Sequence, residues 1–315
     1  MIRPHKPRFQ PRRRQLLQAL AAPTILLPMA SRLYAESASA AMIQRPIPAS
    51  GELLPVIGLG TYQSFDIGTS AAERDPVKDV LRLFAQHGGK LVDSSPMYGR
   101  SESALGELAT ELAVTQKLFM ATKVWTSGRE AGIRQMEESL RRMQVARMDL
   151  MQIHNLQDWQ THLNTLRQWK SAGRIRYTGI THYHSGAYAE LERLMKMKEF
   201  DFVQCNYSIA EREAEQRILP LARDLGIAVI VNRPFAQASL FSRVKGKDLP
   251  AWAAEFDCAS WAQFFLKYIL GHPAVTCVIP ATGKPKHLVD NMMAGIGKLP
   301  DAPMRARMAQ FMDAV

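Results

Sequence analysis

Residues 90–108 of this 315-residue chain hold the structural unit from which the fold follows, and they read KLVD at 90–93, SSPMYGR at 94–100 and SESALGEL at 101–108. The apolar run Lys90–Asp93 predicts a buried strand that ends in a carboxylate. The apolar spacing of Ser101–Leu112 predicts a helix. A short polar loop that carries Tyr98 joins the two. A strand followed by a loop and a helix is one βα unit, and repeats of that unit predict an α/β protein with parallel strands.

The same unit recurs along the chain. Further strands are predicted at Val56–Gly60, Leu118–Lys123, Met148–His154, Gly179–Thr181, Phe202–Cys205, Ile227–Val231 and Val278–Ile279. Further helices are predicted at Val77–Gln86, Ile133–Arg142, Thr161–Ser171, Ala187–Lys198, Glu213–Leu225, Cys258–Leu270, Pro285–Ala294 and Pro303–Ala314. Eight strands, each followed by a helix, predict a (β/α)8 TIM barrel over residues 41–315, with an inserted loop at Ala236–Pro250.

The alternative fold is a doubly wound sheet with a dinucleotide-binding fingerprint. Gly58 and Gly60 could begin such a fingerprint, but position 63 is Gln63 instead of glycine. No acidic residue follows at the spacing that this motif requires. The sequence therefore favours the barrel.

Composition indicates a soluble globular protein, with 47% hydrophobic and 22% charged residues. The three cysteines, Cys205, Cys258 and Cys277, are too few and too scattered for a disulfide scaffold or a zinc cluster. Of the formal net charge of +11, residues 1–40 contribute +6 and residues 41–315 only +5. The predicted barrel is mildly basic, which argues against nucleic acid as a partner.

Residues 1–40 resemble a twin-arginine export signal. Arg13 and Arg14 precede the moderately apolar run Leu16–Ala30, which is shorter than the roughly 20 residues that span a bilayer. Ala38-Ser39-Ala40 then offers a cleavage site before Ala41. The alternatives are a basic arm or an uncleaved interfacial anchor. The resemblance implies export of the folded protein to the periplasm by the twin-arginine machinery, with no membrane anchor after cleavage.

Three consecutive predicted strands end in titratable residues of different kinds, Asp93, Lys123 and His154, and Tyr98 lies in the loop after the first. In a (β/α)8 barrel the carboxyl ends of the strands carry the chemistry, so we expect one shared site. Ordinary polarity at strand ends is the alternative.

Together these four side chains would make the Tyr98 phenol a proton donor. A phenol has a pKa of about 10, and a neighbouring ammonium that a carboxylate holds in place would lower it. An imidazole would orient a substrate carbonyl. No serine or cysteine nucleophile and no carboxylate pair accompanies them. Protonation of an alkoxide requires a hydride from elsewhere, and a nicotinamide cofactor is the usual source.

Between about Gly51 and Asn291 the chain resembles the aldo-keto reductases. The matching segments are Asp93 with SSPMYGRSE at 94–102, TKVW at 122–125, QIHN at 152–155, GRIRYTGIT at 173–181 and IPATGKPKH at 279–287. The resemblance implies reduction of aldehydes and ketones with NADP(H), or with NAD(H) as the alternative. It makes Tyr98 the general acid, tuned by Lys123 and Asp93, and it makes His154 the residue that orients the carbonyl. Tyr62, Tyr98, Trp125 and His154 would line the substrate pocket.

The resemblance also assigns a set of cofactor-binding residues. These are Gly60, Thr61, Asp93, Thr181, His182, Gln204, Asn232, Arg233, Pro234, Phe235, Thr282, Lys284, His287 and Asn291.

At three places the chain departs from the family pattern. His182 stands where the family has asparagine, and Asn232 stands where many members stack a tyrosine on the nicotinamide, which leaves Tyr207 and Phe235 as candidates for stacking. Ala281 and His287 replace two cations of the 2′-phosphate site, for which Lys284 or Lys286 would substitute.

His182 and His184, two apart and without a nearby cysteine or carboxylate, do not predict a metal site. Two other functions compete with the reductase. One is an exported dinucleotide-binding sensor without turnover, which has no need of the four catalytic residues. The other is a barrel that binds a sugar or metabolite without a cofactor, against which Gln204, Thr282 and Asn291 argue.

Overall fold

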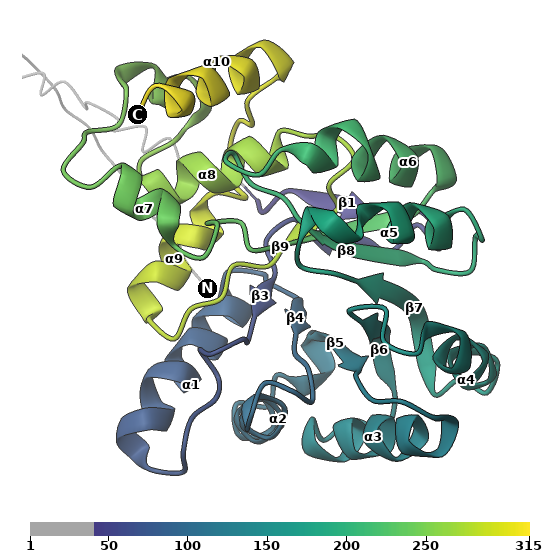
Figure 1. The fold of residues 1–315 in the computed structure, drawn as a ribbon. Helices are drawn as coiled ribbons and strands as arrows, with labels where there is room; N and C mark the ends of the chain where they lie inside the picture. The colour runs from purple at the N-terminus through teal and green to yellow at the C-terminus, as the bar shows by residue number, and fades with distance from the viewer. Residues whose placement is uncertain (1–40) are drawn as a thin grey trace, which may run out of the picture. The chain divides into compact units, whose positions relative to one another are not determined.

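The computed structural model describes residues 41–315, so the predicted twin-arginine signal lies outside the described residues. Eight parallel strands lie side by side in the order β3 to β10. Bridges from Ile57 to Val278 and from Gly60 to Ala281 bring the first and last strands together. Figure 1 shows helices around the outside of these strands. The prediction of a (β/α)8 barrel is confirmed.

The barrel strands are β3 (Leu59–Gly60), β4 (Leu91–Asp93), β5 (Phe119–Val124), β6 (Met148–His154), β7 (Ile175–Thr181), β8 (Phe202–Asn206), β9 (Ala228–Asn232) and β10 (Cys277–Val278). The helices are α1 (Ala71–Gln86), α2 (Ser101–Glu111), α3 (Arg129–Arg142), α4 (Trp159–Ser171), α5 (Tyr188–Met195), α6 (Ile218–Leu225), α7 (Ser239–Arg243), α8 (Trp261–Leu270), α9 (Pro285–Met293) and α10 (Ala302–Asp313). Short 3₁₀ turns lie at Thr115–Lys117, Ser185–Ala187, Glu213–Gln216 and Ala251–Phe256.

A hairpin that the sequence patterns did not predict precedes the barrel. Its strands β1 (Gln44–Pro46) and β2 (Leu53–Pro55) pair antiparallel. Ile47 and Leu54 of this hairpin are fully buried and pack with apolar side chains of the barrel interior. The interior beneath the site is therefore a packed core closed by the hairpin, and open space is left to the carboxyl ends of the strands.

Two predicted helices differ in their bounds for local reasons. The predicted helix Glu213–Leu225 is interrupted at Arg217, and α6 begins at Ile218. Pro220 then lies in its first turn, where its missing N–H is not needed. The predicted helix Cys258–Leu270 begins only at Trp261, because the Ser260 side chain caps it by accepting from the Gln263 N–H.

Part of the predicted inserted loop Ala236–Pro250 is the short helix α7. Over residues 41–315, no helix combines the length and the apolar character needed to cross a membrane.

Candidate active site

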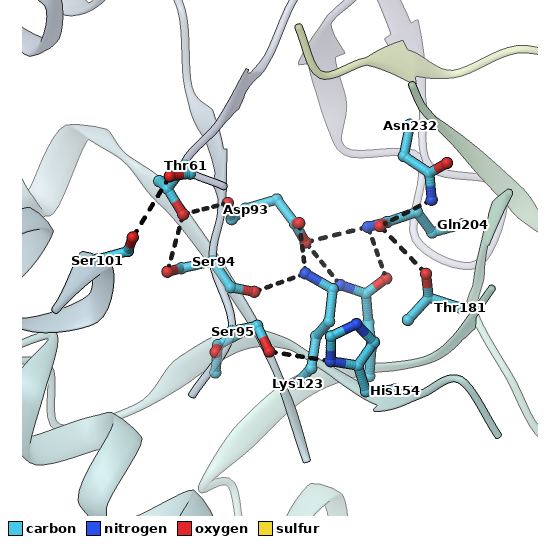
Figure 2. A network of polar contacts seen from close by, with 12 residues as sticks. Thr61, Asp93, Ser94, Ser95, Ser101, Lys123, His154, Thr181, Gln204 and Asn232 are labelled. Carbon is cyan, nitrogen blue, oxygen red and sulfur yellow. Dashed lines mark hydrogen bonds and ion pairs between the residues drawn. The ribbon is translucent and has the colours of Figure 1, made fainter. Parts of the chain in front are cut away.

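Asp93 and Lys123 form a buried ion pair at the carboxyl ends of β4 and β5. The Lys123 Nζ lies 2.6 Å from Asp93 Oδ2, and the Lys123 and Asp93 side chains are 0% and 3% exposed. The ammonium also donates to the Ser94 carbonyl oxygen at 2.6 Å. Figure 2 shows these contacts. Burial alone would lower the pKa of Lys123, but the charge of Asp93 opposes it and the pKa stands above its ordinary value. The ammonium therefore keeps its charge at neutral pH.

Tyr98 lies beside this pair. The Lys123 Nζ is 4.9 Å from the centre of the phenol ring. Sequence reasoning predicted that the ammonium would lower the pKa of this phenol. In the structure burial has the larger effect, and the pKa of Tyr98 stands above its ordinary value although the charge of Lys123 acts in the opposite direction. The phenol therefore remains protonated at neutral pH and is available as a proton donor.

His154 ends β6 and lies beside Tyr98, with ring centres 5.9 Å apart. Its Nδ1 lies 3.0 Å from the Ser95 hydroxyl. Burial, and then the charge of Lys123, lower the pKa of His154 to about 2. The imidazole is therefore neutral, and the hydroxyl of Ser95 fixes the orientation of its ring. Ser95 was not predicted, since no spacing rule separates it from the other polar residues of its loop.

The depressed pKa of His154 predicts a loss of stability in acid. In the unfolded chain the ring takes up a proton below a pH of about 6.5, whereas the folded ring does not until a pH of about 2. Below pH 6.5 the unfolded state therefore binds the additional proton. We expect the free energy of unfolding to fall by about 2 kcal/mol more in the wild type than in His154→Asn between pH 7 and pH 5. Urea unfolding at both pH values measures this, and equal losses in the two proteins would contradict it.

Aromatic side chains continue the site toward its opening. Tyr62 packs edge-on against Tyr98 with ring centres 5.0 Å apart, and Trp125 lies 6.2 Å from the His154 ring. Tyr62 is 53% and Trp125 40% exposed. The Gln135 side chain accepts from the Trp125 N–H at 2.6 Å and donates to its carbonyl oxygen at 3.1 Å. These two hydrogen bonds hold the backbone of Trp125 in place. The predicted substrate-lining residues Tyr62, Tyr98, Trp125 and His154 therefore lie next to one another.

Gln152 joins the site from β6 and was not predicted. Its Nε2 donates to Asp93 Oδ1 at 2.8 Å. A signal was available in the sequence, because Gln152 lies two residues before His154 on the same strand and alternate residues share a face. Gln204, from β8, donates to the same Asp93 oxygen at 3.1 Å.

Thr181 and Asn232 approach Gln204 from the neighbouring strands β7 and β9. The Thr181 hydroxyl donates to Gln204 Oε1 at 3.1 Å, and Asn232 Nδ2 donates to the same oxygen at 3.3 Å. The structure thus brings three of the predicted cofactor-binding residues into one polar group (Figure 2).

His182 follows Thr181 at the end of β7. Its Nδ1 accepts from the Tyr183 N–H at 3.0 Å. Burial and the neighbouring His184 lower the pKa of His182 to about 4, so the ring is neutral. Because Nδ1 accepts, the proton of the neutral ring is on Nε2, which leaves His182 as a hydrogen-bond donor. Within residues 41–315 no cluster of three metal-ligating side chains occurs.

Other predicted cofactor residues have structural roles of their own. A Cβ on Gly60 would lie 2.8 Å from the Ile279 carbonyl oxygen, so glycine permits closure of the barrel there. Thr61 is fully buried, and its hydroxyl lies 3.0 Å from the Asp93 carbonyl oxygen. Phe235 packs against the aromatic rings of Phe241 and Phe265.

Tyr207 does not lie at the site as a stacking residue. It is fully buried, and its hydroxyl donates to Glu215 at 2.5 Å beneath α10. Arg305 of α10 donates to the same carboxylate at 2.6 Å. The ring is part of the packing between η3 (Glu213–Gln216) and the C-terminal helix.

The remaining predicted residues lie on the loop after β9, on the loop before α9 and in α9 itself. Arg233 adopts a left-handed backbone with φ of 51° and donates to the Tyr183 carbonyl oxygen at 2.9 Å, and Pro234 after it is buried. Thr282 accepts from the Lys284 N–H at 3.1 Å, just before α9. Lys284, Lys286 and His287 are exposed at the start of α9, while Asn291 is buried further along the same helix.

A closed parallel barrel with a buried lysine–aspartate pair, a phenol and a neutral imidazole at its carboxyl face defines an enzyme that moves a proton at a polar substrate group. The aldo/keto reductase family model matches residues 56–307. The chain belongs to the aldo/keto reductase family and is an oxidoreductase.

Relatives and solved structures agree with this assignment. The chain is 28% identical to methylglyoxal reductase YeaE of Escherichia coli over 79% of this chain and 89% of that protein. It is 31% identical to mouse (Mus musculus) aflatoxin B1 aldehyde reductase member 2 over 71% and 65%, respectively. The fold is similar to that of an aldo-keto reductase from Klebsiella pneumoniae solved in complex with NADPH, with a TM-score of 0.73, 24% identity and coverage of 86% of this chain and 96% of that one.

Proposed function

We propose that this protein reduces an aldehyde or ketone to an alcohol with NADP(H). The observation that carries the proposal is the Lys123–Asp93 pair, buried at 2.6 Å beside the protonated phenol of Tyr98. A charged pair buried without function is a poor source of stability, because desolvation offsets its attraction. Here the pair lies beside Tyr98, where the Lys123 ammonium can stabilise the phenolate that forms when Tyr98 gives up its proton.

The residues present suit a dinucleotide. Asn232 Oδ1 and Arg233 Nε are buried and have no hydrogen-bond partner among the described residues. An unpaired buried acceptor and an unpaired buried donor on consecutive residues suit a polar ligand that carries both kinds of group. The N-terminus of α9 has no side-chain cap, and Lys284 and Lys286 lie at its start. A helix N-terminus with adjacent cations favours a phosphate.

Each of the four catalytic side chains has a separate role in the reaction. When bound, the reduced cofactor supplies a hydride. The neutral imidazole of His154 donates from Nε2 to the substrate carbonyl oxygen when the Ser95 hydroxyl donates to Nδ1. The Tyr98 hydroxyl gives its proton to the same oxygen as that oxygen becomes an alkoxide. Lys123 then stabilises the phenolate left on Tyr98, and Asp93 holds the ammonium in place.

The test is direct. Purified protein is mixed with NADPH and a panel of aldehydes and ketones that includes methylglyoxal, and the absorbance of the reduced cofactor is followed. We expect the absorbance to decay only when a carbonyl compound is present. Binding of NADPH without decay on any compound would instead favour a sensor.

We expect NADP(H) to bind at least about tenfold more tightly than NAD(H), a difference of about 1.4 kcal/mol. The cations at the start of α9 would pair with the 2′-phosphate that only NADP(H) carries. Charge reversal by Lys284→Glu should remove most of this preference and leave NAD(H) affinity nearly unchanged. Fluorescence titrations measure all four affinities. Equal affinity of the wild type for the two cofactors would show that these lysines do not bind the phosphate.

We also propose that the protein is exported folded to the periplasm by the twin-arginine machinery, which rests on the sequence of residues 1–40 alone. We expect protein from a periplasmic extract to begin near Ala41, as measured by mass spectrometry. A double substitution Arg13→Lys with Arg14→Lys should keep the full-length chain in the cytoplasm. Cytoplasmic wild-type protein that retains Met1 would refute the proposal.

A further inference from the structure

The loop that carries Tyr98, residues 94–100, is anchored to the barrel at its start. The Ser94 N–H donates to the Ala121 carbonyl oxygen of β5 at 2.9 Å, and the Tyr98 N–H donates to the Ser95 carbonyl oxygen at 3.0 Å. These two hydrogen bonds hold the chain as far as Tyr98. The direction of the phenol also depends on how the chain continues after Tyr98, and there the contacts come from a different loop.

Asp66 provides the first of these contacts. It lies in the loop between β3 and α1, residues 61–70, and its Oδ1 accepts from the Arg100 N–H at 2.9 Å. Arg100 is the residue just before α2, and its own side chain does not cap that helix. A carboxylate is favourable at a helix N-terminus, where backbone N–H groups lack partners within the helix. Asp66 therefore holds the beginning of α2, two residues after Tyr98.

Gly99, directly after Tyr98, allows the carboxylate to approach this closely. Its backbone is left-handed with φ of 57°, and a Cβ at this position would lie 2.2 Å from Asp66 Oδ1 and 2.4 Å from Asp66 Cγ. A larger residue would strain the backbone and displace Asp66. The Asp66 carboxylate therefore packs against the one residue between Tyr98 and Arg100.

The same two loops meet at two further points. The Arg100 Nε donates to the Ile67 carbonyl oxygen at 3.1 Å. Tyr62, at the other end of the loop that contains Asp66, packs edge-on against the Tyr98 ring with ring centres 5.0 Å apart. Asp66 thus lies on a loop that contacts both the catalytic ring and the backbone that follows it.

We propose that Asp66 is a positioning residue for the Tyr98 phenol and acts through the backbone of Gly99 and Arg100. The proposal rests on the proposed function, because it concerns the general acid of that reaction. Glycine adopts many backbone conformations with little cost, so the contacts of Asp66 select the one that Gly99 has here. A displacement of about 1 Å in a reacting group can lower a rate about a hundredfold. Even partial release of this loop should therefore slow the reaction.

The test measures single-turnover reduction by the wild type, Asp66→Ala, Asp66→Asn and Glu73→Ala. Each protein is saturated with NADPH and mixed with a saturating aldehyde in a stopped-flow instrument, so that the decay of the reduced cofactor reports the chemical step. Asp66 is exposed, so its replacement should leave the protein folded. Titration with NADPH gives both the affinity and the fraction of folded binding sites.

Two of the variants are controls. Asp66→Asn keeps an acceptor oxygen for the Arg100 N–H in a side chain of nearly the same shape. Glu73→Ala is the matched control for loss of a carboxylate beside the same loop. The Glu73 carboxylate accepts from the Gly68 N–H at 3.1 Å and from the Ser70 hydroxyl, both within residues 61–70.

We expect Asp66→Ala to lower the single-turnover rate at least about tenfold. Its dissociation constant for NADPH should stay within about twofold of the wild-type value, because Asp66 contacts the loop of the general acid. Asp66→Asn and Glu73→Ala should each retain at least about half of the wild-type rate. A role in stability alone would instead reduce the fraction of NADPH-binding sites and leave the rate per site unchanged.

Three results would overturn the inference while the proposed function stands. In the first, Asp66→Ala retains more than half of the wild-type rate per binding site. In the second, Asp66→Asn is as slow as Asp66→Ala, which would show that the acceptor oxygen does not position Tyr98. In the third, Glu73→Ala is slowed equally. If the wild type binds NADPH and reduces no carbonyl compound, the proposed function itself fails, and the inference fails with it.

Discussion

Tyr98→Phe is expected to lower the turnover of carbonyl reduction by a factor of about 10² to 10⁴, the usual contribution of a general acid. The ring would still fill its place between Tyr62 and His154, with which it packs at 5.0 and 5.9 Å. Only the proton donor is removed, and removal of a buried hydroxyl leaves the Lys123–Asp93 pair intact. Steady-state kinetics with NADPH and the best aldehyde measure the loss.

The control for Tyr98→Phe is cofactor affinity. The phenol oxygen is needed only when the alkoxide is protonated, so the dissociation constant for NADPH should change by no more than about twofold. Tyr62→Phe, a neighbouring phenol at the exposed rim, is the matched variant and should keep most of the turnover. If Tyr98→Phe retains more than about a tenth of wild-type turnover on every accepted aldehyde, the acid is another group.

Lys123→Met is expected to impair both stability and turnover. Removal of the ammonium leaves the Asp93 carboxylate buried with no opposite charge, and breaking a buried pair from one side destabilises a protein by about 3–5 kcal/mol. Turnover should fall at least about a hundredfold, because the phenolate of Tyr98 loses its cation. Chemical unfolding and steady-state kinetics measure the two effects separately.

A second substitution separates the two effects. Asp93→Asn in the Lys123→Met background removes the uncompensated charge, so we expect it to recover much of the lost stability and none of the turnover. Asp93→Asn alone should lower turnover less than Tyr98→Phe, since it removes a supporting charge and leaves the donor. Recovery of turnover in the double variant would show that Lys123 acts only on stability.

The sequence predicted the barrel and the catalytic cluster because both follow from chain order. In a barrel of parallel βα units, consecutive strands are neighbours, so residues at their carboxyl ends meet. Asp93 pairs in register with Ala121, two residues before Lys123, and the long lysine side chain spans that offset. Asp93, Lys123 and His154 were therefore found from apolar runs and the residues that end them. The N-terminal hairpin was not predicted, because its strands are too short to show an alternation of apolar and polar residues.

The tertiary structure alone decided which groups are free to act. Spacing along one strand fixes which side chains share a face, but their partners come from strands far apart in the chain: Gln204 donates to Asp93, and Asn232 donates to Gln204. The same holds for protonation. The sequence contained both the phenol and the ammonium, yet the pKa of Tyr98 is raised by burial more than it is lowered by Lys123. The burial of a side chain depends on all the residues that surround it in space, and a local pattern along the sequence does not contain that information.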